Sequence, residues 1–175
     1  RTASQILERS IQYELDNYQD YDQALRAAVL DRLLVGRGTA WVRFENYETS
    51  TVDGESIPNA YACVDAVFWE DFRQSPARLW EEVTWVARRV YMTRDDGIER
   101  FGENFKKVPL LHEPIGLQEM KDSGDDCEHL KKAKVWEIWD KSTKSVIWVV
   151  EGYPKILDKK DDPYGLDSFW PCPKP

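Results

Sequence analysis

The sequence has few of the residues on which most catalytic and metal-binding sites depend. Its 175 residues include two histidines and three cysteines. The cysteines, Cys63, Cys127 and Cys172, are odd in number and widely spaced, which favours a reducing compartment over a secreted, disulfide-stapled domain. Long hydrophobic runs are also missing. No apolar stretch approaches the roughly 20 residues of a membrane-spanning helix, so we predict no membrane association.

Motifs for phosphate binding and nucleophilic catalysis are absent as well. Neither G-x-x-x-x-G-K-S/T nor G-x-G-x-x-G occurs, and Gly36-Arg37-Gly38 follows a helical pattern, so it predicts a helix end. A nucleophilic serine or cysteine needs a neighbouring histidine, and His112 and His129 both lie in an irregular stretch. The sequence therefore predicts a chain that is not an enzyme, with no catalytic, cofactor-binding or metal-binding residues.

Three weaker chemical patterns do not outweigh that prediction. Cys127 and His129 stand two residues apart but lack the second close pair of a structural zinc site. The acidic stretch 158–162 lacks the ligand spacing and central glycine of a calcium-binding loop. The pair Glu70-Asp71, at the end of a predicted strand, is the most suggestive of glycoside hydrolysis, although a polar pair that opens a loop is the commoner explanation.

Acidic residues outnumber basic ones by 32 to 24, giving a formal net charge of −8. Residues 1–87 hold 15 acidic and 8 basic residues (net −7), whereas residues 88–175 hold 17 and 16 (net −1). This balance excludes a protein that grips phosphates over its whole surface. The second half does contain basic clusters, which we interpret as solvated faces. They are Arg88-Arg89, Lys106-Lys107 and Lys131-Lys132-Ala133-Lys134.

Hydrophobic periodicity predicts an α+β fold, in which an N-terminal helical pair precedes a mainly antiparallel sheet with short helical insertions. The expected helices span 3–16, 21–35, 77–83 and 94–104. The expected strands span 39–47, 60–69 and 84–92, followed by a hairpin of 133–140 and 145–151. The segments 49–59, 108–130 and 152–175 are expected to be loops or irregular structure.

Several local features refine this prediction. Asp20 is the expected N-cap of the second helix, and Thr93 that of the helix starting at residue 94. The second helix carries an unusually broad apolar stripe, which predicts burial on more than one side. That stripe consists of Leu25, Ala28, Val29 and Leu33, widened by Leu30 and Leu34. In the helix at 77–83, Leu79 and Trp80 are expected to be buried. Strand tryptophans are expected to serve as core or subunit-interface residues, namely Trp41, Trp85, Trp136, Trp139 and Trp148.

The order of these features resembles the portal proteins of tailed bacteriophages, the head-to-tail connectors. Residues 31–44 (DRLLVGRGTAWVRF) resemble the family's passage from a long helix through Gly-x-Gly into a strand. Residues 67–76 (VFWEDFRQSP) and 77–94 (ARLWEEVTWVARRVYMTR) resemble its acidic-aromatic turn and following strand. The helix ending in ERFG at 99–102, the hairpin with VWEIWD and VIW, and FWPCP at 169–173 follow in the same order.

This resemblance implies a structural role in the virion. Portal subunits form a ring, generally a dodecamer, at one capsid vertex, through which a terminase packages DNA and through which DNA is later ejected. The implied partners are other portal subunits, capsid protein and terminase, with DNA passing through without tight binding. Residues 1–36 would be a helical segment packing on the wing and residues 37–175 the β-rich wing. The Pro-rich run 170–175 suggests a piece of a longer protein, with the stem, clip and crown beyond it.

Two other functions remain open at this point. The first is a non-catalytic, Trp-rich β module that binds a carbohydrate or peptide, which requires an exposed tryptophan platform. The second is a glycoside hydrolase-like enzyme using Glu70 and Asp71, which requires a closed pocket around them. The portal hypothesis makes a contrasting prediction, that the apolar stripe on the helix at 21–35 and the two-sided aromatic hairpin are partly exposed in the isolated chain.

Overall fold

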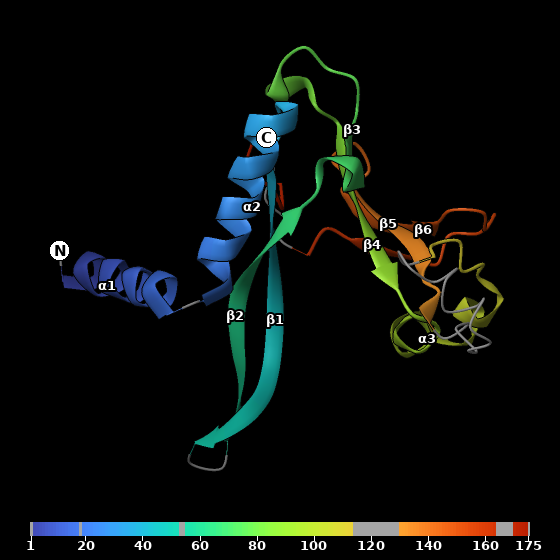
Figure 1. Cartoon of the computed structure of the whole chain (residues 1–175). Helices are drawn as coiled ribbons and strands as arrows, with labels where there is room; N and C mark the ends of the chain where they lie inside the picture. The colour runs from blue at the N-terminus through green and yellow to red at the C-terminus, as the bar shows by residue number, and fades with distance from the viewer. Residues whose placement is uncertain (1, 18, 53–54, 114–129, 164–169, 175) are drawn as a thin grey trace, which may run out of the picture. The chain divides into compact units, whose positions relative to one another are not determined.

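Two helices begin the chain and antiparallel strands follow them, which confirms the predicted α+β class (Figure 1). The computed structural model describes residues 2–17, 19–52, 55–113, 130–163 and 170–174. The chain divides into two units, and each has its own sheet. Unit 1 comprises residues 1–69 and 171–175, and unit 2 comprises residues 70–170.

Unit 1 starts with α1 (Thr2–Asn17) and α2 (Gln19–Val35). The N-cap prediction for Asp20 is wrong because α2 already begins one residue earlier, so Asp20 lies inside the helix. The predicted end of α2 is confirmed. Gly36 has a φ of 86° and donates its N–H to the carbonyl oxygen of Arg32 at 3.0 Å, as a C-terminal glycine does.

A long antiparallel hairpin follows, formed by β1 (Thr39–Val52) and β2 (Glu55–Val67) (Figure 1). The loop prediction for 49–59 is wrong, since all of its described residues belong to these two strands. Threonine favours strands despite its polarity, and this preference outweighs the turn residues of the segment. Pro58 is accommodated where the β1–β2 register shifts, a place where a proline disturbs few ladder hydrogen bonds.

The helix α2 packs on this hairpin through its small residues. Ala24 is buried, and Gly38 approaches the helix so closely that a Cβ atom there would lie 1.8 Å from the carbonyl oxygen of Ala28. The carboxylate of Asp31 accepts the backbone N–H of Trp69 at 3.1 Å, which ties α2 to the chain just beyond β2. The contact between helix and hairpin is therefore a close one made by alanine and glycine.

The closing residues of the chain complete unit 1. The N–H of Val42 in β1 donates to the carbonyl oxygen of Pro171 at 2.6 Å, and both Pro171 and Cys172 are buried. Burial raises the pKa of the Cys172 thiol to about 12, so the thiol stays protonated. The core of unit 1 also includes Ala40, Trp41, Cys63 and Val67.

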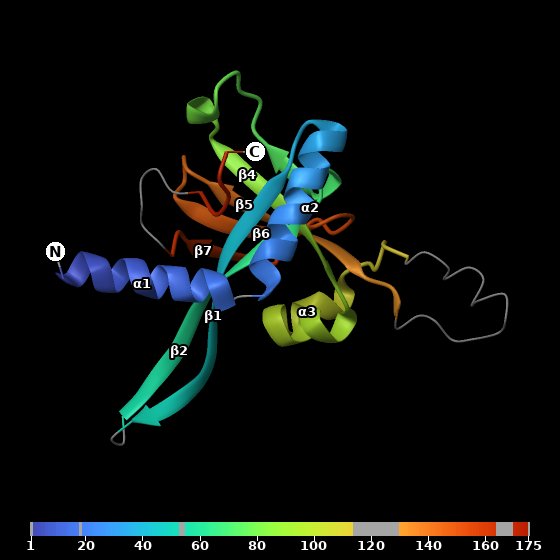
Figure 2. The same ribbon diagram turned by 60° about the vertical axis from the view of Figure 1, so that its left-hand side comes forward.

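Unit 2 is built on a five-stranded antiparallel sheet with the order β3-β4-β5-β6-β7 (Figure 2). The predicted hairpin of 133–140 and 145–151 is confirmed as β5 and β6. The two edge strands, β3 and β7, were not predicted from the sequence. Each is only three or four residues long, and β7 consists entirely of charged residues, which are common in edge strands. The strands are β3 (Phe72–Gln74), β4 (Trp85–Met92), β5 (Ala133–Asp140), β6 (Ser145–Val150) and β7 (Asp158–Asp161).

The helical insertions of unit 2 are shorter than predicted. The helix at 77–83 is only a 3-10 turn, η2 (Trp80–Glu82). The predicted burial of Leu79 and Trp80 is wrong, because Leu79 is 59% exposed and Trp80 is half-buried. The N-cap prediction for Thr93 is confirmed: its hydroxyl accepts the N–H of Asp96. A second 3-10 turn, η1 (Trp69–Asp71), precedes β3.

Gly102 splits the predicted helix at 94–104 into two elements. The first, α3 (Arg94–Phe101), ends at Gly102, which has a φ of 72°. The second is a 3-10 helix, η3 (Gly102–Lys107). Both pack on one face of the sheet, where the ring of Phe101 lies 6.4 Å from that of Trp148 and 5.9 Å from that of Phe105. We call this the covered face of the sheet.

The covered face carries most of the buried side chains of unit 2, because successive residues of a strand point to opposite faces. Along β5, burial alternates without interruption from Ala133 to Asp140. The covered face includes Phe72, Val86, Val135, Glu137, Trp139, Val146 and Trp148. The opposite face holds Arg73, Arg89, Tyr91, Lys134, Trp136, Ile138, Ile147 and Val149, and we call it the cation–aromatic face.

Candidate functional site

The carboxylate pair singled out by the sequence lies at the edge of the cation–aromatic face. Glu70 is exposed, whereas Asp71 is half-buried directly before β3. One oxygen of Asp71, Oδ1, accepts the Nε–H of Arg89 at 2.6 Å and the hydroxyl of Tyr91 at 3.1 Å. Asp71 therefore holds two side chains of β4 in place, which is a positioning arrangement.

A second carboxylate, Glu151, closes the same network from the end of β6. Its Oε1 accepts the indole N–H of Trp136 at 2.9 Å and lies 3.5 Å from Nη1 of Arg89. The ammonium of Lys134 is 3.7 Å from its other oxygen. The guanidinium of Arg89 also lies 5.4 Å from the ring centroid of Trp136 and 5.3 Å from that of Tyr91. The cation is therefore enclosed by two carboxylates and two rings.

The surroundings of this network keep the Glu151 carboxylate ionised and the Tyr91 hydroxyl protonated at neutral pH. Burial raises the pKa of Glu151, but the hydrogen bond from Trp136 and the nearby Lys134 and Arg89 outweigh burial and leave that pKa lowered. Burial, with Asp71 beside it, raises the pKa of Tyr91. General acid–base catalysis works best with a group whose pKa lies near the working pH, and these shifts move both groups away from neutrality.

His112 stands beside this network and packs on one of its members. Its ring packs on Tyr91 with the centroids 4.2 Å apart, and its backbone pairs with Lys132. Burial, together with Lys134 and Lys132, lowers the pKa of His112, so the imidazole is neutral at physiological pH. The other two metal-ligand candidates, Cys127 and His129, lie outside the described residues.

Within the ranges that the structure describes, no group of three or more His, Cys, Asp or Glu side chains could hold a metal ion. The acidic stretch 158–162 contributes instead to β7, where Asp158 accepts the N–H of Lys159 and lies 3.4 Å from the ammonium of Lys160. Membrane insertion has no support from the helices either, since none in the described part of the chain is both long and apolar enough to cross a bilayer.

The basic clusters of the second half are largely occupied by carboxylates. Arg88 lies on the covered face and bonds Glu137 at 2.9 Å, and Glu137 also accepts the indole N–H of Trp139 at 2.8 Å. Phosphate binding draws on unneutralised cations, so paired side chains offer little to a DNA backbone. Further ion pairs of these clusters are Arg89–Asp71, Lys106–Glu103, Lys131–Glu113 and Lys134–Glu151.

The tryptophans mostly serve the interior, which confirms the core prediction for Trp41, Trp139 and Trp148. Trp85 and Trp136 are half-buried, and Trp136 is flanked by arginine side chains. Among the eight tryptophans, all of them in described parts of the chain, Trp69 alone is exposed, at 44%. A stacking platform made of tryptophans needs several exposed indoles in a row, and a single exposed indole does not provide one.

The most unusual surface of the chain is on α2. Ala24 is buried against the hairpin, whereas large apolar side chains point away from it into solvent. Their exposed fractions run from 37% for Leu25 to 78% for Leu33. The whole set is Leu25, Val29, Leu30, Leu33, Leu34 and Val35. We call this the outer leucine face. The prediction that this stripe is buried on several sides is wrong within one chain, and the contrasting prediction of exposure is confirmed for the stripe. The same prediction also included the aromatic hairpin, whose residues in β5 and β6 are all buried or half-buried.

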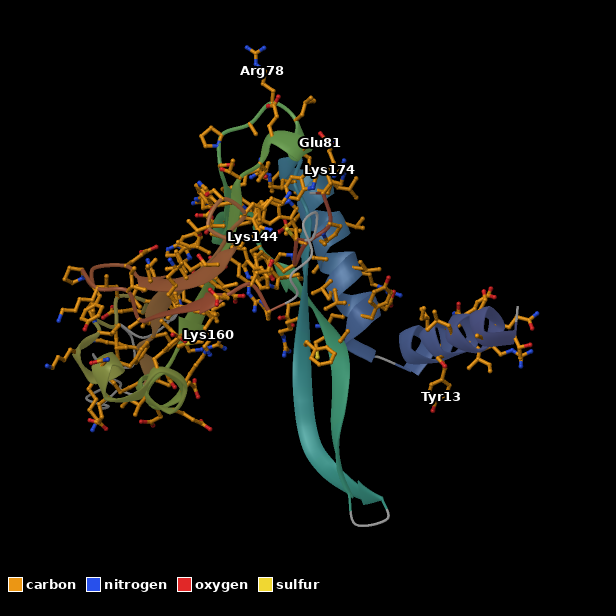
Figure 3. All side chains as sticks on the ribbon, turned by 180° about the vertical axis from the view of Figure 1, so that it is seen from behind. Tyr13, Arg78, Glu81, Lys144, Lys160 and Lys174 are labelled. Atoms are coloured by element: carbon orange, nitrogen blue, oxygen red, sulfur yellow. The ribbon has the colours of Figure 1, made fainter. Side chains whose placement is uncertain are left out.

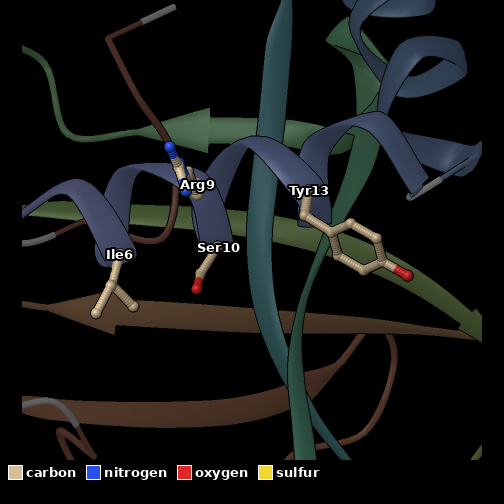
Figure 4. Close-up of a pocket in the computed structure, with 4 residues that line it drawn as sticks. All are labelled: Ile6, Arg9, Ser10 and Tyr13. Atoms are coloured by element: carbon tan, nitrogen blue, oxygen red, sulfur yellow. The ribbon is translucent and has the colours of Figure 1, made fainter.

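The helix α1 adds a second exposed apolar surface. Every side chain of α1 for which burial is described is exposed, including Ile6, Leu7, Ile11 and Tyr13 (Figure 3). Ile6, Arg9, Ser10 and Tyr13 follow one another at helical spacing and line a shallow hollow on α1 (Figure 4). One helix alone cannot enclose a small molecule, so this hollow is part of an apolar face and not a ligand site.

No protein-family model matches the chain, and no curated protein matches its sequence. The geometry of unit 1 and unit 2 is therefore the basis for a functional proposal.

Proposed function

We propose that the chain is a structural segment of a ring-forming subunit of the tailed-phage portal type, which assembles at a capsid vertex and lets DNA through during packaging and ejection. The observation that carries this proposal is the outer leucine face of α2. Monomeric soluble proteins rarely expose contiguous apolar patches of this kind, and such patches mark contacts between proteins. In the proposed ring, a neighbouring subunit covers that face.

The order of the elements supports the same proposal. A helix that ends at Gly36-Arg37-Gly38 leads into a long strand, and the tryptophan-rich hairpin β5–β6 follows later in the chain. The helix end, the long strand and the hairpin are all among the features by which the sequence resembles portal proteins. Carboxylates also neutralise much of the basic clusters, which suits a conduit that must release DNA after contact, because few counterions would be released on binding.

The proposal assigns the chain no turnover, and its partners are further copies, capsid protein and terminase in the virion. It is tested by sedimentation velocity and negative-stain electron microscopy of the purified chain over a wide concentration range. Closed rings with a fixed number of copies are the expected result. A chain that stays monomeric throughout, or that forms only open-ended aggregates, contradicts the proposal.

A further inference from the structure

The chain passes from one unit to the other at two places. The first crossing lies between Trp69 and Glu70, and the second lies between Trp170 and Pro171. Units of one chain move relative to each other by default, unless a large apolar interface holds them together. The residues on either side of the two crossings therefore decide which movements remain possible.

The first crossing is anchored on both of its sides. In unit 1, the backbone N–H of Trp69 donates to the carboxylate of Asp31 in α2 at 3.1 Å. In unit 2, the carboxylate of Asp71 accepts the Nε–H of Arg89 at 2.6 Å. Glu70 lies between these two anchors and is exposed, so its φ and ψ are the backbone angles that can change at this crossing.

The second crossing is anchored even more closely. The ring of Trp170 lies 6.2 Å from that of Trp80, and the ammonium of Lys141 is 4.2 Å from its centroid, which holds the indole in unit 2. The carbonyl oxygen of Pro171 accepts the N–H of Val42 in β1 at 2.6 Å, which holds this residue in unit 1. The two anchored residues are neighbours in the sequence, so this crossing has no spare chain.

Proline makes the second crossing stiffer than the first. The ring of Pro171 fixes its own φ at about −65° and confines ψ of Trp170 to about +120° to +160°. Because both residues are anchored, ψ of Trp170 is the main angle that can still change. Its range limits a rotation at this crossing to about 40°.

The two crossings are set well apart on unit 2. Asp71 lies level with Arg89 of β4, whereas Lys141, which holds Trp170, donates its N–H to the carbonyl oxygen of Thr84 directly before β4. Arg89 and Thr84 are five residues apart (89 minus 84), which corresponds to about 17 Å along a strand. A body that is held at two separate points keeps one movement, which is rotation about the line that joins them.

We infer that unit 1 and unit 2 swing relative to each other about a single axis, which passes through Glu70 and the bond between Trp170 and Pro171. Sliding, or rotation about any other axis, is blocked because it would stretch one of the crossings. The swing leaves both sheets and the packing of α2 intact, since each anchoring contact lies within one unit. It is a property of a single chain and does not depend on the proposed ring.

Pulsed electron spin resonance measures this movement as the width of the distance distribution between two nitroxide labels. One label is attached at Arg26→Cys in unit 1 and the other at Glu103→Cys in unit 2, where the native side chains are 80% and 78% exposed. The labelled chain also carries Cys127→Ser, and Cys63 and Cys172 are buried and can stay. An excess of unlabelled chain isolates each labelled pair, whether or not copies assemble.

A pair within unit 2, Glu103→Cys with Lys155→Cys, gives the width that the labels alone produce, and we expect the pair between units to be at least twice as broad. The critical variant inserts three glycines between Trp170 and Pro171, which keeps both anchors but adds about 10 Å of chain. This variant should broaden the distribution at least twofold again. The same insertion between Pro154 and Lys155, an exposed stretch of unit 2, is the matched control and should leave the width unchanged.

Asp31→Ala tests the first crossing without changing the second. It removes the acceptor of the Trp69 N–H on the protein surface and should also broaden the distribution between units.

Three results would overturn the inference. In the first, the pair between units is as narrow as the pair within unit 2, because the units are then one rigid body. In the second, the parent chain is as broad as the variant with glycines between Trp170 and Pro171, because the second crossing then confines nothing. In the third, neither that variant nor Asp31→Ala changes the width. The same widths are expected from rings and from monomers, so a failure of the proposed function leaves this test unaffected.

Discussion

The junction between α2 and the hairpin provides the sharpest test of unit 1. A Cβ atom at Gly38 would lie 1.8 Å from the carbonyl oxygen of Ala28 and 2.7 Å from its carbonyl carbon. Cβ atoms in proteins essentially never come within 3.0 Å of such atoms. Gly38→Ala must therefore move α2 away from β1 by at least 1.2 Å (3.0 minus 1.8), since the opposing atoms belong to the backbone and cannot rotate away.

This displacement separates Ala24 from the hairpin. Overpacking of a closed interior costs about 1–3 kcal/mol. Because no side-chain rotation can relieve a contact with backbone atoms, we expect Gly38→Ala to destabilise unit 1 by about 3 kcal/mol. The same movement would shift the outer leucine face, so assembly should weaken in parallel.

Gly36 is the matched control, two residues away. It has a φ of 86° and no atom within 4 Å of its Cβ position, so its cost on substitution is conformational and not steric. Asparagine tolerates the left-handed conformation, and Gly36→Asn should cost less than about 1 kcal/mol. Gly38→Asn should be as damaging as Gly38→Ala.

Hydrogen exchange measured by mass spectrometry, combined with urea unfolding, distinguishes these variants. In Gly38→Ala, amide protection should fall across α2 and β1 and stay unchanged in β4, β5 and β6, because those strands belong to unit 2. Equal protection in the variant and the parent chain would refute the reasoning. So would a Gly36→Asn variant as unstable as Gly38→Ala.

Two further predictions concern unit 2. Removing one partner of a buried ion pair costs about 3–5 kcal/mol, so Glu137→Leu should lower the free energy of unfolding by about that amount, whereas Glu137→Leu combined with Arg88→Met should restore most of it. Additive losses in urea unfolding would contradict this. Burial raises the pKa of Asp140, but hydrogen bonds from Ser142 and Thr143 outweigh it and leave that pKa lowered. Its stabilisation is therefore full above the unfolded-state pKa and is lost as the pH falls through the folded-state value, and Asp140→Asn should flatten the acid limb of the stability–pH curve.

The elements that could be predicted from the sequence are those whose pattern is decided locally. Alternation along residues 133–140 and the cap at Thr93 depend on near neighbours, and both are confirmed. Edge strands such as β7 depend on a partner strand elsewhere in the chain, and their charged residues carry no apolar signal. The pairing of residues 49–52 with β2 was missed for the same reason, since turn residues were weighed without the opposite strand.

The outer leucine face and the Asp71 network could not be predicted in full, because both depend on contacts between segments that are distant in the sequence. The apolar periodicity of α2 was evident from the sequence, but the sequence did not indicate that its alanines face the hairpin. The close approach of Gly38 and Ala28 decides that orientation. Asp71 was singled out as a carboxylate, yet its partners Arg89 and Tyr91 lie 18 and 20 residues away. A signal for this network exists in the alternation of β4, which places both partners on one face.

The route of the chain through unit 1 has a consequence for protein synthesis. Val42 is made early, but the carbonyl of Pro171 that accepts its N–H is made 129 residues later (171 minus 42). At about 5–20 residues per second, this interval lasts on the order of ten seconds. Unit 2 can fold in that time, while the N–H of Val42 is still without its final acceptor. A nascent chain halted before Trp170 therefore lacks the bond that joins β1 to the closing residues of unit 1.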